Sequence, residues 1–202
     1  MTFLYKTGQL YTDGKFAKDQ AIVVEDGLIK AIGPTKALQE KYRGVEEIDW
    51  HDKALVPGTI NAHNHSFQSL LRGIAVDRPF LEWRDEALYK YTPLLDEEAI
   101  YTGALFAFGE MLKYGATTVS DFFYVHNNGT KTDEAVIQAA NDLGIRLVMA
   151  RTMYDWMVPR LITVNRLKTR QSVREIWRLS TKEMRWLTST LHRIVLMRPR
   201  QK

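Results

Sequence analysis

The sequence predicts an α/β fold in which a β-rich N-terminal segment precedes alternating strands and helices. Residues 1–56 contain short apolar runs separated by turn residues, a pattern typical of strands. After the Pro57-Gly58 corner, three strand-like runs alternate with helical patterns. Strand–helix units of this length indicate a parallel sheet with right-handed crossovers. Three such strands form only part of a closed architecture.

The N-terminal strands are expected to include a tight hairpin. In "QAIVVEDGLIKAIG", two apolar runs meet at Asp26-Gly27, a dipeptide that accepts the positive φ angles of a two-residue turn. A short helix over Thr35–Tyr42 is expected to interrupt the strands. The segment "EEIDWHDKALVPG" then adds a further extended stretch that ends at Pro57-Gly58.

The strands that follow Gly58 are separated by two predicted helices. "TINAH" (Thr59–His63) is a short strand, and Asp96 starts a helix whose first turn is acidic and which ends at Gly115. The β-branched strand "ATTVSDFF" comes next. The second helix, in "TDEAVIQAANDLG", has Thr132 as its candidate N-cap and Gly144 as its C-terminal glycine, and the strand "IRLVMAR" follows it.

The composition allows a core and excludes several classes of protein. The chain has 202 residues, of which 45% are hydrophobic, so a sizeable core is expected. The lack of cysteine excludes disulfides, thiolate metal sites and a cysteine nucleophile, and it fits a reducing, cytoplasmic location. The N-terminus shows no signal-peptide pattern, and no apolar run approaches the ~20 residues of a membrane span.

Two of the five histidines lie one residue apart in "LVPGTINAHNHSFQSLLRG". Side chains alternate along a strand, so His63 and His65 are expected to point to one side and Asn64 to the other. Two imidazoles on one face could bind one divalent cation, and the end of a strand is where parallel α/β proteins place their sites. A His-x-His pair by itself is weak evidence, because surface or core histidines are more common.

This stretch, followed by "PFLEW" and "EMLKYGATTVSDFF", resembles the amidohydrolase superfamily. The closest likeness is to its aminohydrolase and chlorohydrolase branch, which includes adenosine-derivative, guanine and triazine deaminases. The resemblance covers roughly residues 3–156. It implies that residues 1–56 form part of a small β-sandwich, and that residues 57–156 form the first βα units of a metal-dependent (β/α)8 barrel. Residues 157–202 are an atypical basic tail.

The resemblance also implies a chemistry. His63 and His65 would bind a single divalent ion, most often zinc and in some members iron. A metal-activated water would then hydrolyse a C–N bond of an amino-substituted heterocycle and release ammonia. The partner implied is a small heterocyclic substrate, with a homo-oligomer possible in the full-length form and neither a membrane nor nucleic acid expected.

Other positions match the family less specifically. Gln68 and Glu82 match positions where some members contact the substrate, Glu82 by binding sugar hydroxyls; the alternatives are a solvated loop amide and a charged residue on a helix surface. For Asp121, on the second barrel strand, a structural role is favoured. His126 is expected to be an exposed loop histidine, and His51 a surface residue.

Several ligands expected from the family are missing. A third metal-binding histidine in a His-x-x-Glu motif, a further histidine that orients the water, and a late metal-binding aspartate are not found. After His126, His192 is the only histidine, and no glutamate stands three residues after it. We therefore expect the chain to be truncated and inactive, because a usual catalytic site has three protein ligands.

The tail differs in charge from the rest of the chain. Residues 157–202 hold 12 of the 28 Lys and Arg residues but only 2 of the 24 acidic ones, which gives this segment a charge of +10 and residues 1–156 a charge of −6. Three interpretations stay open. The tail could form amphipathic helices, with apolar residues from Ile176 to Ile194 at roughly helical spacing; it could bind nucleic acid or an acidic surface; or it could be an out-of-frame translation that begins near Trp156. Reading the nucleotides across Trp156 tests the last of these.

Overall fold

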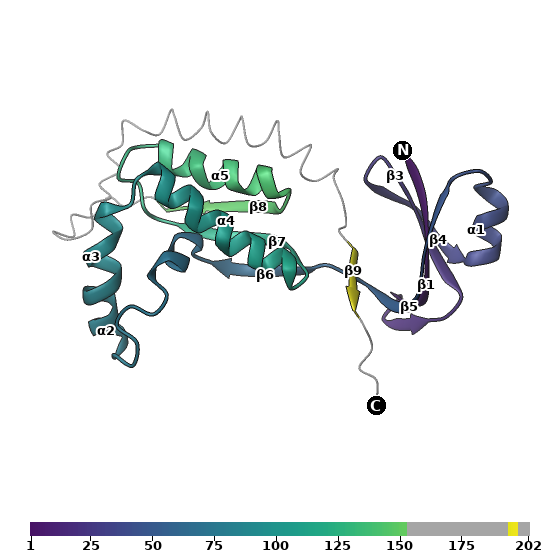
Figure 1. Ribbon diagram of the computed structural model, residues 1–202, viewed down its shortest axis with the longest axis horizontal. Coiled ribbons are helices and arrows are strands. Elements are labelled where there is room, and N and C mark those ends of the chain that lie inside the picture. Colours follow the sequence, from purple (N-terminus) through teal and green to yellow (C-terminus); the bar gives the residue numbers. More distant parts are fainter. Residues whose placement is uncertain (153–193, 198–202) are drawn as a thin grey trace. The chain divides into compact units, whose positions relative to one another are not determined.

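The computed structural model describes residues 1–152 and 194–197, and Figure 1 shows their arrangement. The chain forms two compact units. In its described residues, the first comprises residues 1–59 and 194–197, and the second comprises residues 60–152. No helix in the described part of the chain is long and apolar enough to cross a membrane.

The first unit is built on a six-stranded sheet. Its strands follow the order β4-β3-β1-β5-β9, and β2 pairs with β1. Their bounds are β1 (Thr2–Thr12), β2 (Lys15–Ala17), β3 (Gln20–Glu25), β4 (Leu28–Pro34), β5 (Glu46–Pro57) and β9 (Ile194–Met197). The neighbours β1 and β5 run parallel, whereas β9 pairs antiparallel with the end of β5. Because Ile194 begins a strand, the helical interpretation of the tail is wrong at this residue; the other tail residues lie outside those described.

The predicted hairpin and short helix of this unit are confirmed. Strands β3 and β4 are antiparallel, and Asp26 and Gly27 between them have φ angles of 49° and 79°. Helix α1 (Thr35–Lys41) follows β4 and buries Leu38 against Leu4. The other face of the sheet has its own apolar cluster, built from Leu10, Ile22, Val24 and Leu55. Apolar side chains on both faces therefore hold these strands together.

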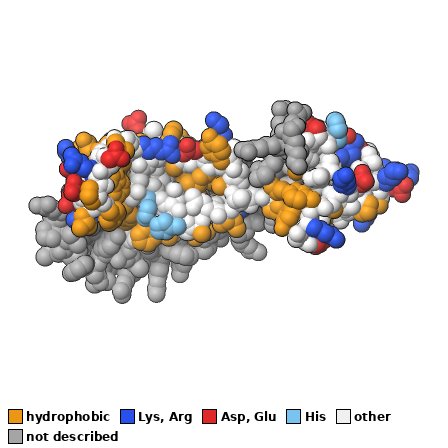
Figure 2. Space-filling view, turned by 90° about the horizontal axis from the view of Figure 1, so that it is seen from below, with side chains coloured by type: hydrophobic (Ala, Val, Ile, Leu, Met, Phe, Trp, Pro, Cys, Tyr) orange, Lys and Arg blue, Asp and Glu red, His pale blue; other side chains and the backbone are white. Residues whose placement is uncertain are grey.

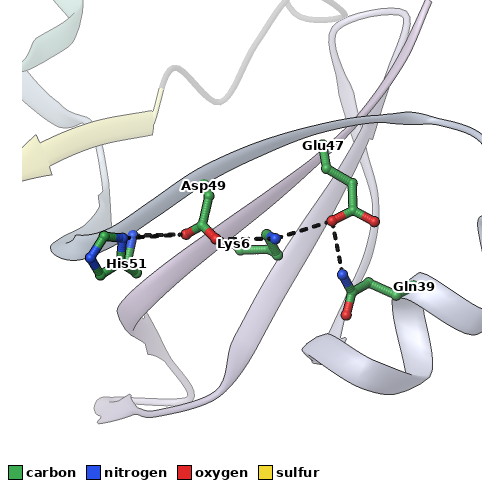
Figure 3. Close-up of polar contacts among 5 residues, drawn as sticks. All are labelled: Lys6, Gln39, Glu47, Asp49 and His51. Atoms are coloured by element: carbon green, nitrogen blue, oxygen red, sulfur yellow. Dashed lines mark hydrogen bonds and ion pairs between the residues drawn. The ribbon is translucent and has the colours of Figure 1, made fainter.

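Strands β1 and β5 also carry a network of charged side chains, drawn in Figure 3. Lys6 Nζ lies 3.1 Å from Glu47 Oε2 and 3.1 Å from Asp49 Oδ2. Gln39 donates a 2.8 Å hydrogen bond to Glu47, and the His51 ring lies beside Asp49. The two carboxylates raise the pKa of Lys6. The pKa of Asp49 is lowered mainly by Lys6, and that of Glu47 by Gln39 and then by Lys6.

We expect Lys6→Met to produce a small loss of stability that depends on pH. Carboxyls with lowered folded-state pKa values stabilise the fold above their unfolded pKa, and this stabilisation is lost as the pH falls through the folded values. The difference between wild type and Lys6→Met in urea unfolding should therefore be present at pH 7 and shrink at pH 3 or in 1 M salt. Lys18→Met is the control, because Lys18 is exposed and shows no ion pair among the described residues. Equal differences at both pH values would contradict the prediction.

The second unit contains a three-stranded sheet in the order β6-β7-β8. Its strands are β6 (Thr59–Asn64), β7 (Ala116–Phe123) and β8 (Arg146–Arg151), and β7 and β8 are parallel as predicted. Helices α4 (Glu97–Lys113) and α5 (Lys131–Leu143) pack on this sheet (Figure 1). One apolar cluster joins the helices to the strands; its largest buried side chains are Phe67, Phe108, Phe123, Ile100 and Ile145. The described part of this unit thus has one core, on the helix side of the sheet.

The helix ends of this unit agree with the sequence in three of four cases. The Asp96 side chain accepts a 2.8 Å hydrogen bond from the Ala99 amide and caps α4, and Gly115 and Gly144 follow the two helices with φ angles of 88° and 66°. The prediction of Thr132 as N-cap is wrong, because α5 starts earlier and Thr130 is the N-cap. The side chain of Thr132 is instead fully buried.

Short helical turns connect β6 to α4. A 3₁₀ helix, η1 (Ser66–Leu71), follows the histidine pair directly. After a loop, the chain continues through α2 (Phe80–Trp83), the π-helical turn η2 (Arg84–Leu88), α3 (Tyr89–Tyr91) and the 3₁₀ turn η3 (Thr92–Leu94). The η1 segment is anchored to α4, because Ser69 Oγ donates a 2.8 Å hydrogen bond to the Gly103 carbonyl. This contact holds the segment after the histidines against the core.

Candidate metal centre

His63 and His65 lie side by side at the end of β6. Their Nε2 atoms are 3.2 Å apart and their ring centroids 4.8 Å apart. His63 is exposed and His65 half-buried, and histidine side chains reach the surface in the space-filling view (Figure 2). The predicted placement of both rings on one side of the strand is confirmed.

The separation of the two nitrogens fits a shared metal ion. Two nitrogens at about 2.0–2.1 Å from one ion, at a tetrahedral angle, are about 3.3 Å apart. The observed 3.2 Å is close to this value. Without an ion, the same distance suits a hydrogen bond between the rings. The spacing of the two nitrogens is therefore compatible with two ligands on one cation.

The hydrogen bond on the other side of His65 sets its tautomer. His65 Nδ1 lies 2.7 Å from the carbonyl oxygen of Phe122 in β7. A carbonyl only accepts hydrogen bonds, so Nδ1 is the donor, and in the neutral ring this leaves the lone pair on Nε2. Metal-binding histidines are commonly oriented by such a bond at their second nitrogen. The neutral form of His65 thus presents the lone pair of Nε2 toward His63.

Aromatic side chains surround the His65 ring. Phe122, Tyr124 and Phe67 have ring centroids 5.5, 5.3 and 6.5 Å from that of His65. Phe122 also stacks on His63 at 6.0 Å. These rings limit the space in which the two imidazoles can turn, which favours one arrangement of the pair.

Asp121 lies on the opposite face of the sheet, among the residues of β7 that face the helices. Its side chain is fully buried, and its carboxylate accepts hydrogen bonds from Asn64 Nδ2 (2.8 Å), the Ser66 amide (2.7 Å) and Ser66 Oγ (2.7 Å). Burial raises the pKa of Asp121, although the bonds from Ser66 and Asn64 act in the opposite direction. The structural role favoured for this residue agrees with these contacts.

The two predicted substrate-contacting residues are placed differently. Gln68, in η1, donates a 2.7 Å hydrogen bond from Nε2 to the hydroxyl of Tyr124, whose ring contacts His65. Glu82, in α2, is exposed and lies 3.6 Å from Arg78, and no contact in the described part of the chain joins it to the histidines. The structure thus brings Gln68, but not Glu82, into contact with the surroundings of the histidine pair.

The prediction for His126 is wrong, whereas His51 is exposed as expected. The His126 side chain is only 2% exposed, and its Nδ1 lies 3.0 Å from Asp133 Oδ1, at ion-pair distance but without hydrogen-bond geometry. Asp133 also pairs with Arg151 at 2.6 Å. His126 is therefore buried beside an ion pair between α5 and β8.

Two contributors to the site were missed from the sequence. Tyr124 contacts His65 and Gln68 from the loop after β7, and the Phe122 carbonyl binds His65. The second is a backbone group and has no sequence signal. Within residues 1–152 and 194–197, no third His, Asp or Glu joins the pair in a cluster that could hold a metal ion.

Comparison with known proteins identifies a family. The model of the amidohydrolase family matches residues 54–199. This match continues through most of the basic tail; the out-of-frame hypothesis for residues 157–202 stays a prediction.

Curated relatives are deaminases of adenosine derivatives. The chain is 30% identical over 167 residues to a 5-methylthioadenosine/S-adenosylhomocysteine deaminase of Syntrophobacter fumaroxidans, covering 82% of this chain and 36% of the relative. It is 35% identical over 138 residues to a 5'-deoxyadenosine deaminase of Methanocaldococcus jannaschii, covering 68% and 31%. The chain therefore spans about a third of the length of these relatives.

Solved structures share the fold. An adenosine deaminase from Xanthomonas campestris with bound zinc matches with a TM-score of 0.74 and 23% identity, over 87% of this chain and 40% of that one. A guanine deaminase from C. acetobutylicum, with guanine in its active site, matches with a TM-score of 0.69 and 25% identity, over 87% and 42%. The similarity therefore extends over most of this chain.

Proposed function

Because the chain belongs to the amidohydrolase family, we propose that His63 and His65 are metal ligands of a hydrolase that deaminates an amino-substituted heterocycle. The observation that supports this most strongly is the pair of Nε2 atoms, 3.2 Å apart at the end of β6. Zinc is the proposed ion, since an adenosine deaminase that shares the fold binds it. When bound, the ion supplies Lewis acidity and brings the pKa of a coordinated water toward neutrality.

The residues of this chain contribute orientation. The bond from His65 Nδ1 to the Phe122 carbonyl holds the ring with Nε2 toward His63, where the two nitrogens would hold the ion. Gln68 and Tyr124, joined at 2.7 Å beside His65, are proposed to contact the substrate ring through the amide and hydroxyl. Glu82 is proposed to bind substrate hydroxyls.

The architecture proposed for the whole protein follows the family. Residues 1–56 would form part of a β-sandwich, and residues 57–156 the first βα units of a (β/α)8 barrel. The further metal ligands and the carboxylate that transfers protons would then lie outside the described residues. A purine-like, pterin-like or triazine-like amine is the proposed substrate, in a cytoplasmic protein that is a homo-oligomer in its full-length form.

Zinc affinity tests the proposed ligands. We expect His63→Ala and His65→Ala each to weaken zinc binding by the 202-residue chain at least about tenfold, because each removes one of two neighbouring ligands. Competition with a chromophoric zinc chelator measures the affinity. His51→Ala is the control, since His51 is exposed in the first unit, and it should bind as wild type does.

Two results would contradict the proposal. Wild-type zinc affinity in both histidine variants would show that the pair is not the metal site. For the reaction itself, a protein that carries all the family's ligands should release ammonia from an adenosine-, guanine- or triazine-type substrate. Zinc binding at His63 and His65 without ammonia release from any of these would contradict the deaminase assignment.

A further inference from the structure

Asp121 is bonded to the residues on both sides of His65. Asn64 and Ser66 flank this histidine in sequence, and both donate to the Asp121 carboxylate. The next residue after Asp121 is Phe122, whose carbonyl accepts the hydrogen bond from His65 Nδ1. Two consecutive residues of β7 therefore bind the last residue of β6 and the two residues that follow it.

The contacts of these residues lie on two different faces of the sheet. His65 and Phe122 meet on the side of the histidine pair, while Asn64, Ser66 and Asp121 meet on the buried side. The carboxylate holds the backbone amide of Ser66 directly, and it holds Asn64 through that residue's side-chain amide. A fixed backbone limits the positions that the ring can reach, because side-chain rotamers depend on the backbone from which they project.

We propose, as a consequence of the metal site proposed above, that Asp121 is a positioning residue for His65. By holding Asn64 and Ser66 to the end of β7, it keeps His65 Nδ1 on the Phe122 carbonyl and Nε2 toward His63. The ligand pair is then arranged before the ion binds. Residues that orient a metal ligand through hydrogen bonds, without touching the metal, contribute about 10–100-fold to metal affinity.

A purely structural role makes a different prediction. If Asp121 only joins β6 to β7, its loss lowers stability but leaves the His65 ring and the zinc affinity of the folded protein unchanged. The tautomer of His65 in the metal-free protein separates the two roles. It is read from long-range ¹H–¹⁵N correlations of the histidine rings, which require neither metal nor activity.

Asp121→Ala in the 202-residue chain is the main variant, and Asp121→Asn is the conservative one. Alanine removes all three hydrogen bonds. Asparagine keeps an oxygen for Asn64 and the Ser66 amide, and its own amide can donate to Ser66 Oγ. We expect Asp121→Ala to weaken zinc binding about 10–100-fold and to populate both tautomers of His65, and Asp121→Asn to stay within about threefold of wild type.

Ser66→Ala and Ser69→Ala form a matched pair for the case in which Asp121→Ala does not fold. Both lie in η1, and each serine hydroxyl makes a hydrogen bond, one to Asp121 and the other to the Gly103 carbonyl. Ser66→Ala should weaken zinc binding severalfold and shift the His65 tautomer, whereas Ser69→Ala should change neither. Equal changes in zinc affinity and in the His65 tautomer in the two variants would indicate that η1 loosens as a whole, and would overturn the proposal.

The outcomes separate this inference from the proposed function. The positioning role alone would be overturned if folded Asp121→Ala kept wild-type zinc affinity and a single Nδ1–H tautomer at His65. If Asp121→Ala does not fold, the same result in Ser66→Ala would overturn it. If wild type and His63→Ala bind zinc equally, the metal site fails. In that case the tautomer measurement still decides whether Asp121 orients His65.

Discussion

Replacing Asp133 with alanine should destabilise the second unit by about 3–5 kcal/mol, the loss typical of breaking a buried ion pair. Asp133 is fully buried in the first turn of α5. It lies 2.6 Å from Arg151 and 3.0 Å from His126, whose side chains are 5% and 2% exposed. Removing the carboxylate takes this counter-charge from a guanidinium that has little contact with water, while the two basic side chains keep their positions.

Hydrogen exchange followed residue by residue measures this effect, because it reports the stability of each unit separately. Amides of α5 and β8 should lose protection in Asp133→Ala, and those of β1 and β3 should not. Asp142→Ala is the matched control: Asp142 lies on the same helix but is exposed, bonded to Tyr101 and Gln138. Comparable losses in the two variants would contradict the importance of the buried pair.

Gly8→Ala should have the second large effect, a loss of about 2–3 kcal/mol in the first unit. A Cβ atom at Gly8 would stand 2.1 Å from the carbonyl oxygen of His51, far inside van der Waals contact. The close approach occurs where the pairing of β1 with β5 shifts register between Thr7 and Gln9. Because the opposing atom is backbone, β5 itself must move to make room.

A movement of β5 would also weaken a neighbouring hydrogen bond. Thr7 Oγ1 donates to the Lys53 carbonyl at 2.6 Å, across the same irregularity. Gly33→Ala is the control, since a Cβ at that strand position meets only Leu38 at 4.0 Å, an ordinary contact. Urea unfolding and hydrogen exchange of β1 and β5 measure the loss. An effect of Gly8→Ala no larger than that of Gly33→Ala would show that the strands adjust freely.

Features with a local cause were predictable from the sequence. The hairpin at Asp26-Gly27 depends on two residues that tolerate positive φ, and the ends of α4 follow from Asp96 and Gly115. The common side of His63 and His65 follows from the period of two along a strand. Local pattern was not sufficient at the start of α5: Thr132, the predicted N-cap, is buried inside the helix, and Thr130 is the N-cap.

The sequence by itself therefore determined the alternation of strands and helices from β6 to β8, the family and the histidine pair, because each depends on residues that are neighbours in the chain. Only the tertiary structure decided what surrounds the pair. Asp121 reaches Ser66 across 55 residues of sequence, Gln68 reaches Tyr124 across 56, and His126 is buried by Asp133 and Arg151 from different elements. Such contacts depend on which strands become neighbours and which faces the helices cover, and packing of the whole unit sets both.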